Sequence, residues 1–220
     1  MVASNEDRVL SMVRAGTITE AEGQRLMGSL HQRRIGWRML FNPFDRLSTP
    51  VLWILAILVT IGGVGVSRMG VRFDGSLDVH QAPGLPTWSE IFLDAASAIL
   101  VTAVIFWLVS LLVARQGRIV DFLSTVAVAR LPNILVGAAL PWILPPPDEI
   151  LAQAMAGLVP PRLLLALIAL IPGLIWFITL LCTAYKSSSG LRGLRLGISF
   201  TVALLVSEII SKVFLYMVGA

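Results

Sequence analysis

The sequence predicts an all-α membrane protein, in which a small helical hairpin precedes a bundle of five transmembrane helices. Five long apolar stretches, at residues 51–66, 91–114, 127–144, 163–183 and 196–218, each carry no more than two formal charges. Charged residues make up only 14% of the chain and the mean hydropathy is +0.84, whereas about a quarter of a soluble domain is charged. The apolar stretches are continuous rather than alternating, which favours helices over a barrel.

The length of these stretches fits the thickness of a bilayer. A helix rises about 1.5 Å per residue, so roughly 20 apolar residues cross the hydrocarbon core. Four stretches approach or exceed that length. The first needs residues 47–50 or 67–69 to complete its span. We therefore divide the chain into a hairpin at 1–32, a connecting segment at 33–50 and a five-helix domain at 51–220.

Composition and charge exclude several functions. The net charge is +4, but the basic residues are dispersed without a basic helix or a stacking platform, so no nucleic-acid partner is expected. The single cysteine, Cys182, allows no intrachain disulfide and no cysteine metal cluster. No cofactor or metal motif is found. The first fifty residues lack the basic start and short apolar run of a cleaved signal.

Basic residues predict the orientation, because cytoplasmic loops carry the excess of Lys and Arg. Seven arginines precede the first span, and three basic residues accompany each of the second and fourth connections. The opposite connections hold three in all: Arg68, Arg72 and Arg162. The amino end is therefore expected in the cytoplasm and the carboxyl end outside. Trp53, Trp88 and Trp142 lie near span ends, as an interfacial aromatic belt requires.

Residues 5–30 predict two short helices. Gly16 ends the first, and Thr19 with Glu22 forms a capping box that starts the second. Such a hairpin buries little surface and is marginal alone. Its apolar side chains form a candidate partner-binding face: Val9, Leu10, Val13, Leu26, Met27 and Leu30.

The hairpin resembles the SHOCT-like helical hairpin found at bacterial protein termini. The shared pattern is Val9-Leu10, then Gly16-Thr17-Ile18-Thr19-Glu20, then Leu26. The resemblance implies an interaction or oligomerisation element, and a solubilising cap is the alternative. A protein partner or self-association is expected here.

The segment 33–50 mixes basic and aromatic residues. Arg33, Arg34 and Arg38 alternate with Trp37 and Phe41, a mixture that suits a short helix in the headgroup layer. These arginines are candidate lipid headgroup contacts. The alternative is a positive-inside anchor without lipid specificity, since polybasic lipid sites usually contain about 4–8 charges.

The membrane part resembles the Yip (Ypt-interacting-protein) family in its bacterial form, over about residues 41–218. The likeness lies in Asn42-Pro43 before span one, in Gly117-Arg118 and Ala129-Arg130-Leu131-Pro132 around span three, and in Ala184-Tyr185 before the last loop. It implies a non-enzymatic protein of the bacterial cytoplasmic membrane. The Asp-Leu-Tyr-Gly-Pro motif of the eukaryotic members is absent, so their Rab-type GTPase partnership is not implied.

Charged residues within a span are costly and are functional candidates. Glu208 and Lys212 lie four residues apart on one helical face and can pair, and Asp94 lies at a depth where it can join them. A proton or ion relay is one interpretation. An internal pair that locks two helices together is the other, and it is favoured because one pair near one interface is not a path across about 30 Å.

Span three carries Arg130, Pro132 and Asn133. Pro132 removes a backbone hydrogen bond and is expected to kink the helix, while Asn133 can satisfy a freed carbonyl. A broken-helix binding site is the functional alternative. Without an internal repeat, ordinary kinks at Pro132 and at Pro172-Gly173 are favoured.

The connection after span one predicts a small hairpin that turns at Asp74-Gly75. His80, with no second His or Cys nearby, is expected to be a surface residue and not a ligand. A further short helix is expected at 148–158.

Function follows from what the spans lack. We find no paired catalytic acids and no His-Glu-x-x-His pattern, so no enzyme is expected. The predicted function is a scaffold or adaptor that acts through protein–protein interaction. The alternative is a small-solute or ion transporter, which requires a polar set to line a shared cavity: Asp94, Arg130, Asn133, Glu208 and Lys212.

Overall fold

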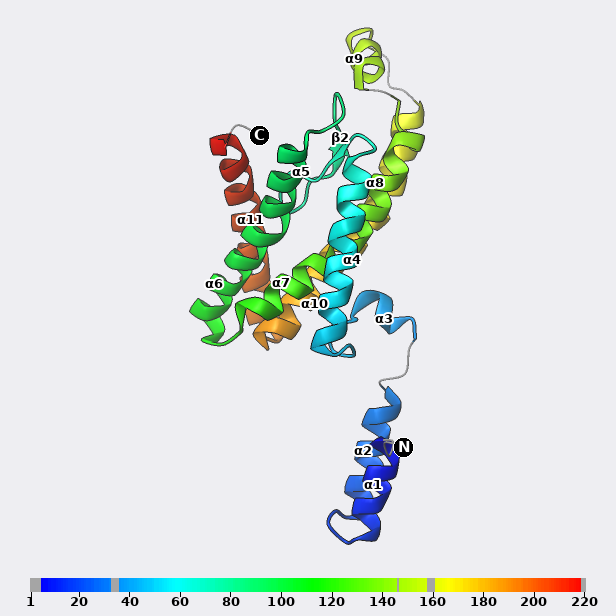
Figure 1. Ribbon diagram of the computed structural model, residues 1–220, viewed down its shortest axis with the longest axis vertical. Coiled ribbons are helices and arrows are strands. Elements are labelled where there is room, and N and C mark those ends of the chain that lie inside the picture. The colour runs from blue at the N-terminus through cyan, green and yellow to red at the C-terminus, as the bar shows by residue number, and fades with distance from the viewer. Residues whose placement is uncertain (1–4, 33–35, 146, 158–160, 219–220) are drawn as a thin grey trace. The chain divides into compact units, whose positions relative to one another are not determined.

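The computed structural model describes residues 5–32, 36–145, 147–157 and 161–218. The chain forms two units, Met1–Arg46 and Leu47–Ala220. The first contains α1 (Asn5–Arg14), α2 (Glu20–Gln32) and the short α3 (Arg38–Phe41), and the second contains the long helices (Figure 1). The boundary between the units falls within the predicted connecting segment.

The predicted helical hairpin is confirmed, together with its stop and start signals. Gly16 has a positive φ of 69°, a conformation that favours glycine after a helix end. The Thr19 backbone N–H donates to Glu22 Oε2 at 2.9 Å, and the Glu22 backbone N–H donates to Thr19 Oγ1 at 3.3 Å. These reciprocal bonds are the expected capping box.

The apolar residues of the hairpin do not all share one outward face. Val9 is 6% exposed, and Val13 packs so closely against Gly23 that a Cβ there would overlap its Cγ2. Leu10 and Leu26 are 44% and 41% exposed, and Met27 is half-buried. Val9 and Val13 therefore contribute to the closure of the hairpin, and Val9 is buried there. The side chain of Leu30 lies outside the described residues.

The second unit contains five helices long and apolar enough to cross a membrane. They run over Thr49–Ser67, Trp88–Ala114, Ile119–Ile143, Ala166–Ser189 and Gly193–Val218. The first is α4 and the last is α11, and the fourth lies within α10 (Pro161–Ser189). The second consists of α5 (Trp88–Ala95), the π-helix η1 (Ala96–Val101) and α6 (Thr102–Ala114), and the third of α7 (Ile119–Ala129) and α8 (Leu131–Ile143).

The third long helix begins eight residues before the predicted start at 127 and is interrupted at its centre. Asp121 lies in the first turn of this helix. A negative charge stabilises the N-terminus of a helix, so Asp121 is compatible with a start before the apolar stretch. The interruption falls at Arg130, and Pro132 occupies the first turn of α8, where its missing N–H costs nothing. Pro172 lies inside α10 without ending it.

The expected hairpin after the first long helix is present, but its turn is wider than predicted. β1 (Val71–Arg72) pairs antiparallel with β2 (His80–Gln81), with Arg72 opposite His80. The loop between the strands is therefore residues 73–79, and Asp74-Gly75 is not a two-residue turn. The helix expected at 148–158 is observed as α9 (Pro147–Met155).

Gly23 provides a test of the hairpin packing. We expect Gly23→Val to open the contact with Val13 and to destabilise the hairpin by about 1–3 kcal/mol, the usual cost of overpacking. Amide hydrogen exchange of α1 in the full chain measures the effect. The matched control is Gly28→Val on the same helix, because an added Cβ there meets no atom within 4 Å. Equal exchange in both variants would contradict this packing.

Candidate functional site

The most unusual feature of the second unit is a loop that enters the helix bundle. Residues 73–79 descend from the β1–β2 strands between the long helices, among α4, α5 and α11 (Figure 1). Ser76 at its tip is 0% exposed, and Phe73 is 6% exposed. We call residues 73–79 the inserted loop. Phe73, Gly75 and Ser76 of this loop are buried and the other four residues are partly exposed, so the polar groups at the buried positions need protein partners.

Charged side chains of the long helices supply two of those partners. Leu77 donates its backbone N–H to Glu208 Oε2 at 2.9 Å. Arg130 Nη1 donates to the Ser76 carbonyl at 3.2 Å and also to the Ala98 carbonyl of η1 at 3.2 Å. The hydroxyls of Ser76 and Thr102 lie 2.7 Å apart. Glu208 and Arg130 thus satisfy the backbone of the inserted loop.

The strand before the inserted loop is held by an ion pair between the partly buried Arg72 and the buried Asp94. Arg72 Nε and Nη2 donate to the two oxygens of Asp94 at 3.0 and 2.8 Å, a bidentate geometry. Asp94 is 2% exposed, and the pair raises the pKa of Arg72 through this hydrogen bond. Removing one partner of such a pair costs about 3–5 kcal/mol, because the other charge is left buried and unpaired.

A further charge cluster joins Asp74 and Asp78 of the inserted loop to Lys212 and His80. Lys212 Nζ lies 2.8 Å from Asp78 Oδ2 and 3.2 Å from Asp74 Oδ2. His80 Nδ1 lies 3.2 Å from Asp74 and 3.8 Å from Asp78. Asp74 and then Asp78 raise the pKa of His80 to about 9. In return, His80 and then Lys212 lower the pKa of Asp78, against the effect of burial.

This cluster has the residue types of a metal site, but its cation is already present. Ligand atoms of Asp74, Asp78 and His80 lie within 4.8 Å of one another. The Lys212 ammonium lies against both carboxylates, where a metal ion would have to bind. The pairing therefore accounts for the two negative charges, and we assign no metal to this cluster.

The five polar residues that were predicted to form one network have different partners in the structure. No ion pair joins Glu208 to Lys212 among the described residues, and Asp94 does not join them. Asp94 binds Arg72. Glu208 accepts from the Leu77 N–H, and Lys212 binds Asp78. The expected pair within one helix is therefore wrong, because the inserted loop offers closer partners. Asn133 is 3% exposed and its Nδ2 has no hydrogen-bond partner in the described part of the chain.

Other predicted site residues had different outcomes. His80 was expected at the surface without a partner. It is half-buried and forms ion pairs with Asp74 and Asp78, because the wider loop places both residues beside it. Arg33 and Arg34 lie outside the described residues, as does the side chain of Arg38, which begins α3. Arg72, Asp74 and Asp78 were not predicted as site residues. Their signal was the cluster of charges around Gly75, whose φ of 128° permits the tight approach to Ser211 and Glu208.

The interruption of the third long helix places Arg130 inside the bundle. Arg130 is 4% exposed and its guanidinium lies 5.6 Å from the ring centroid of Phe177, a cation–π distance. Its second acceptor, Ala98, belongs to a π-helix, a rare form that occurs often at functional sites. The break at Arg130 and the π-helix therefore meet at one point.

Comparison with known proteins adds no relative: no family model, curated protein or solved structure matches the chain. The class that fold and site define is thus a helical protein with five potential membrane-spanning helices and a charge-anchored inserted loop.

The His80 cluster predicts a pH dependence. The folded-state pKa of His80, about 9, lies above its ordinary 6.5, so protonated His80 stabilises the loop fully below pH 6.5. That contribution is lost as the pH rises through about 9. We expect the Tm of the purified protein in detergent to fall over this window, and the fall to diminish in His80→Gln. His31→Gln, at the other histidine of the chain, should leave the profile unchanged. A fall of undiminished size in His80→Gln would contradict the assignment.

Proposed function

We propose that this chain is a non-enzymatic integral membrane protein that acts as a scaffold or adaptor through its amino-terminal hairpin. The proposal places the five long helices in a bilayer, in the bacterial cytoplasmic membrane, with the hairpin in the cytoplasm and the carboxyl end outside. It keeps the Yip-like and SHOCT-like resemblances as working assignments. Its partner is a second protein at the hairpin.

The observation that supports the proposal is that the charged side chains of the long helices bind the segment around the inserted loop. Asp94, Arg130, Glu208 and Lys212 all bind residues 68–87, through side chains or backbone. Charges committed in this way stabilise one conformation of the bundle. A rigid bundle suits a platform that holds other elements in place.

The transporter alternative needs these groups to line a shared cavity. Among the described residues, Asp94 and Arg130 line the same small cavity, whose volume is about 30 Å³. Lys212 and Glu208 instead lie against the inserted loop. This arrangement favours the scaffold over a solute path.

The hairpin provides a surface for a partner. Its Leu10 side chain is 44% exposed, whereas Val9 is buried. Its helices begin and end at strong local signals, the Thr19–Glu22 box and Gly16. The proposal assigns the partner contact to this well-defined element.

Cysteine labelling tests the proposed placement. In a Cys182→Ala background, we expect a membrane-impermeant maleimide to modify Met155→Cys in intact cells, because α9 is placed outside and Met155 is 83% exposed. Gln24→Cys, exposed on α2, should react only after the membrane is permeabilised. The reverse pattern, or extraction of the chain by alkaline carbonate, would contradict the membrane placement.

Photo-crosslinking tests the adaptor role. A photoreactive residue at Leu10, in native membranes, should capture one defined second protein reproducibly, and much less of it when the same residue is placed at Gln24. The Gly23→Val change should abolish the capture and Gly28→Val should not, since only the former disturbs the hairpin. Recovery of self-contacts alone, or of nothing, would overturn the adaptor assignment.

A further inference from the structure

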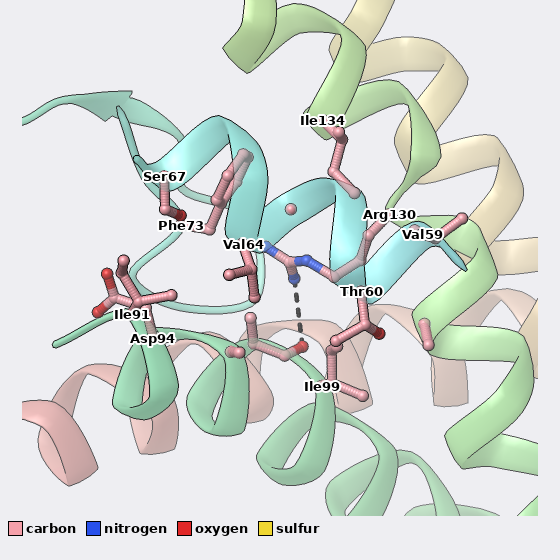
Figure 2. A pocket seen from close by; sticks show the side chains of 14 residues that line it. Val59, Thr60, Val64, Ser67, Phe73, Ile91, Asp94, Ile99, Arg130 and Ile134 are labelled. Carbon is pink, nitrogen blue, oxygen red and sulfur yellow. Dashed lines mark hydrogen bonds between the residues drawn. The ribbon is translucent and has the colours of Figure 1, made fainter. Parts of the chain in front are cut away.

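A small cavity in the second unit has Arg130 and Asp94 in its wall, and Asp94 is paired with Arg72. The cavity lies between α4, the α5–η1 segment and the junction of α7 with α8, and Arg130 reaches into it (Figure 2). The other labelled side chains around it are mainly apolar, such as Val64, Ile99 and Ile134. The space open to the centres of water-sized molecules is about 30 Å³, and one water needs at least about 10–15 Å³. The cavity therefore has room for at least one water-sized group.

Arg130, which lines this cavity, has an unused hydrogen-bond donor. Its Nη1 donates to the Ala98 carbonyl, drawn as the dashed line in Figure 2, and to the Ser76 carbonyl. Its Nη2 is fully buried and has no hydrogen-bond partner in the described part of the chain. An unsatisfied donor on a buried charge costs more than one on a neutral group. The site is therefore incomplete without an acceptor.

No carboxylate of the described chain supplies that acceptor. Asp94 and Glu208 are the acids whose charges act on Arg130. Asp94 is engaged by both nitrogens of Arg72, and Glu208 accepts from Leu77. Neither lies within ion-pair distance of Arg130 among the described residues. An anion from outside the chain can therefore make a contact that the fold leaves open.

An apolar groove adjoins the cavity. By the same measure its volume is about 520 Å³, within the usual range for a ligand pocket. Four residues line both spaces: Thr60, Ala95, Ile99 and Ala127. Ala127 lies one helical turn before Arg130, and two of the four shared residues are alanines, so the wall between the spaces is thin. Exposed apolar side chains such as Ile57 and Phe92 line the outer part of the groove.

We propose that the cavity and groove together bind a single-chain fatty acid, with its carboxylate at Arg130 Nη2 and its alkyl chain in the groove. Each part of this ligand matches one part of the site. Arginine forms strong charge-assisted bonds with carboxylates. The alkyl chain would cover apolar surface along α4 from Ile61 to Trp53, which is about 12 Å of helix.

The apolar groove favours a ligand that joins an anionic group to an alkyl chain over a free anion. A free inorganic anion would fit the charge but leave the groove without a role. The inference requires only the folded bundle, so its failure would leave the adaptor role of the hairpin untouched.

Photolabelling of the purified full-length protein in detergent tests the site. The probe is palmitate with a diazirine in its alkyl chain, and its methyl ester is the matched probe without the charge. We expect the acid to label α4 and η1 about tenfold more than the ester, and excess palmitate to compete. Arg130→Met should reduce labelling by the acid at least tenfold, the effect of losing a charged hydrogen bond, and bring it to the level of the ester.

A second variant tests the groove without changing Arg130. Ala96 lines the groove but not the cavity, so Ala96→Phe should fill the groove and reduce labelling. Ala114→Phe, the same change at a half-buried alanine that lines neither space, should leave labelling unchanged. These comparisons decide the matter even if Arg130→Met fails to fold. Equal labelling by acid and ester, competition by phosphatidylglycerol but not by palmitate, or full labelling of Ala96→Phe would each overturn the proposal.

Discussion

The structure of the second unit depends on the satisfaction of backbone groups of the inserted loop, which enters the bundle as far as the fully buried Ser76. Residues 73–79 leave regular secondary structure and carry Ser76 to complete burial. An unpaired peptide group in such a place would cost several kcal/mol. Glu208 accepts the Leu77 N–H and Arg130 donates to the Ser76 carbonyl. A negative and a positive side chain thus act on neighbouring peptide groups, which explains why apolar helices carry these charges at their centres.

The same constraint explains two irregularities of the helices. The third long helix is interrupted at Arg130, and the second passes through a π-helix at residues 96–101. Both lie where Arg130 bridges the Ser76 and Ala98 carbonyls. The helices deviate from regular geometry at the point where they receive the loop. The Nη2 group of Arg130 makes no hydrogen bond in the described part of the chain, so this arginine retains donors that a ligand can use.

The residues that bind the inserted loop differ in how far the sequence could reveal them. Asp94, Arg130 and Glu208 stand out because a charge within an apolar stretch is rare. Arg72, Asp74 and Asp78 do not, because charges in a connecting segment are ordinary. Spacing of four residues suggested a Glu208–Lys212 pair, but spacing within one helix says nothing about a competing segment 130 residues earlier. The hairpin, by contrast, was predictable, since Gly16, Thr19 and Glu22 act through bonds between neighbours in the chain.

The sequence by itself determined the five long apolar helices, the capped amino-terminal hairpin and the identity of the buried charges. These follow from local composition and from hydrogen bonds over three or four residues. The tertiary structure alone decided that residues 73–79 enter the bundle, that each buried charge binds this segment, and that Val13 closes on Gly23. It also created the cavity at Arg130 beside its apolar groove. Such features depend on contacts between distant parts of the chain, which pack according to shape and leave no periodic signal.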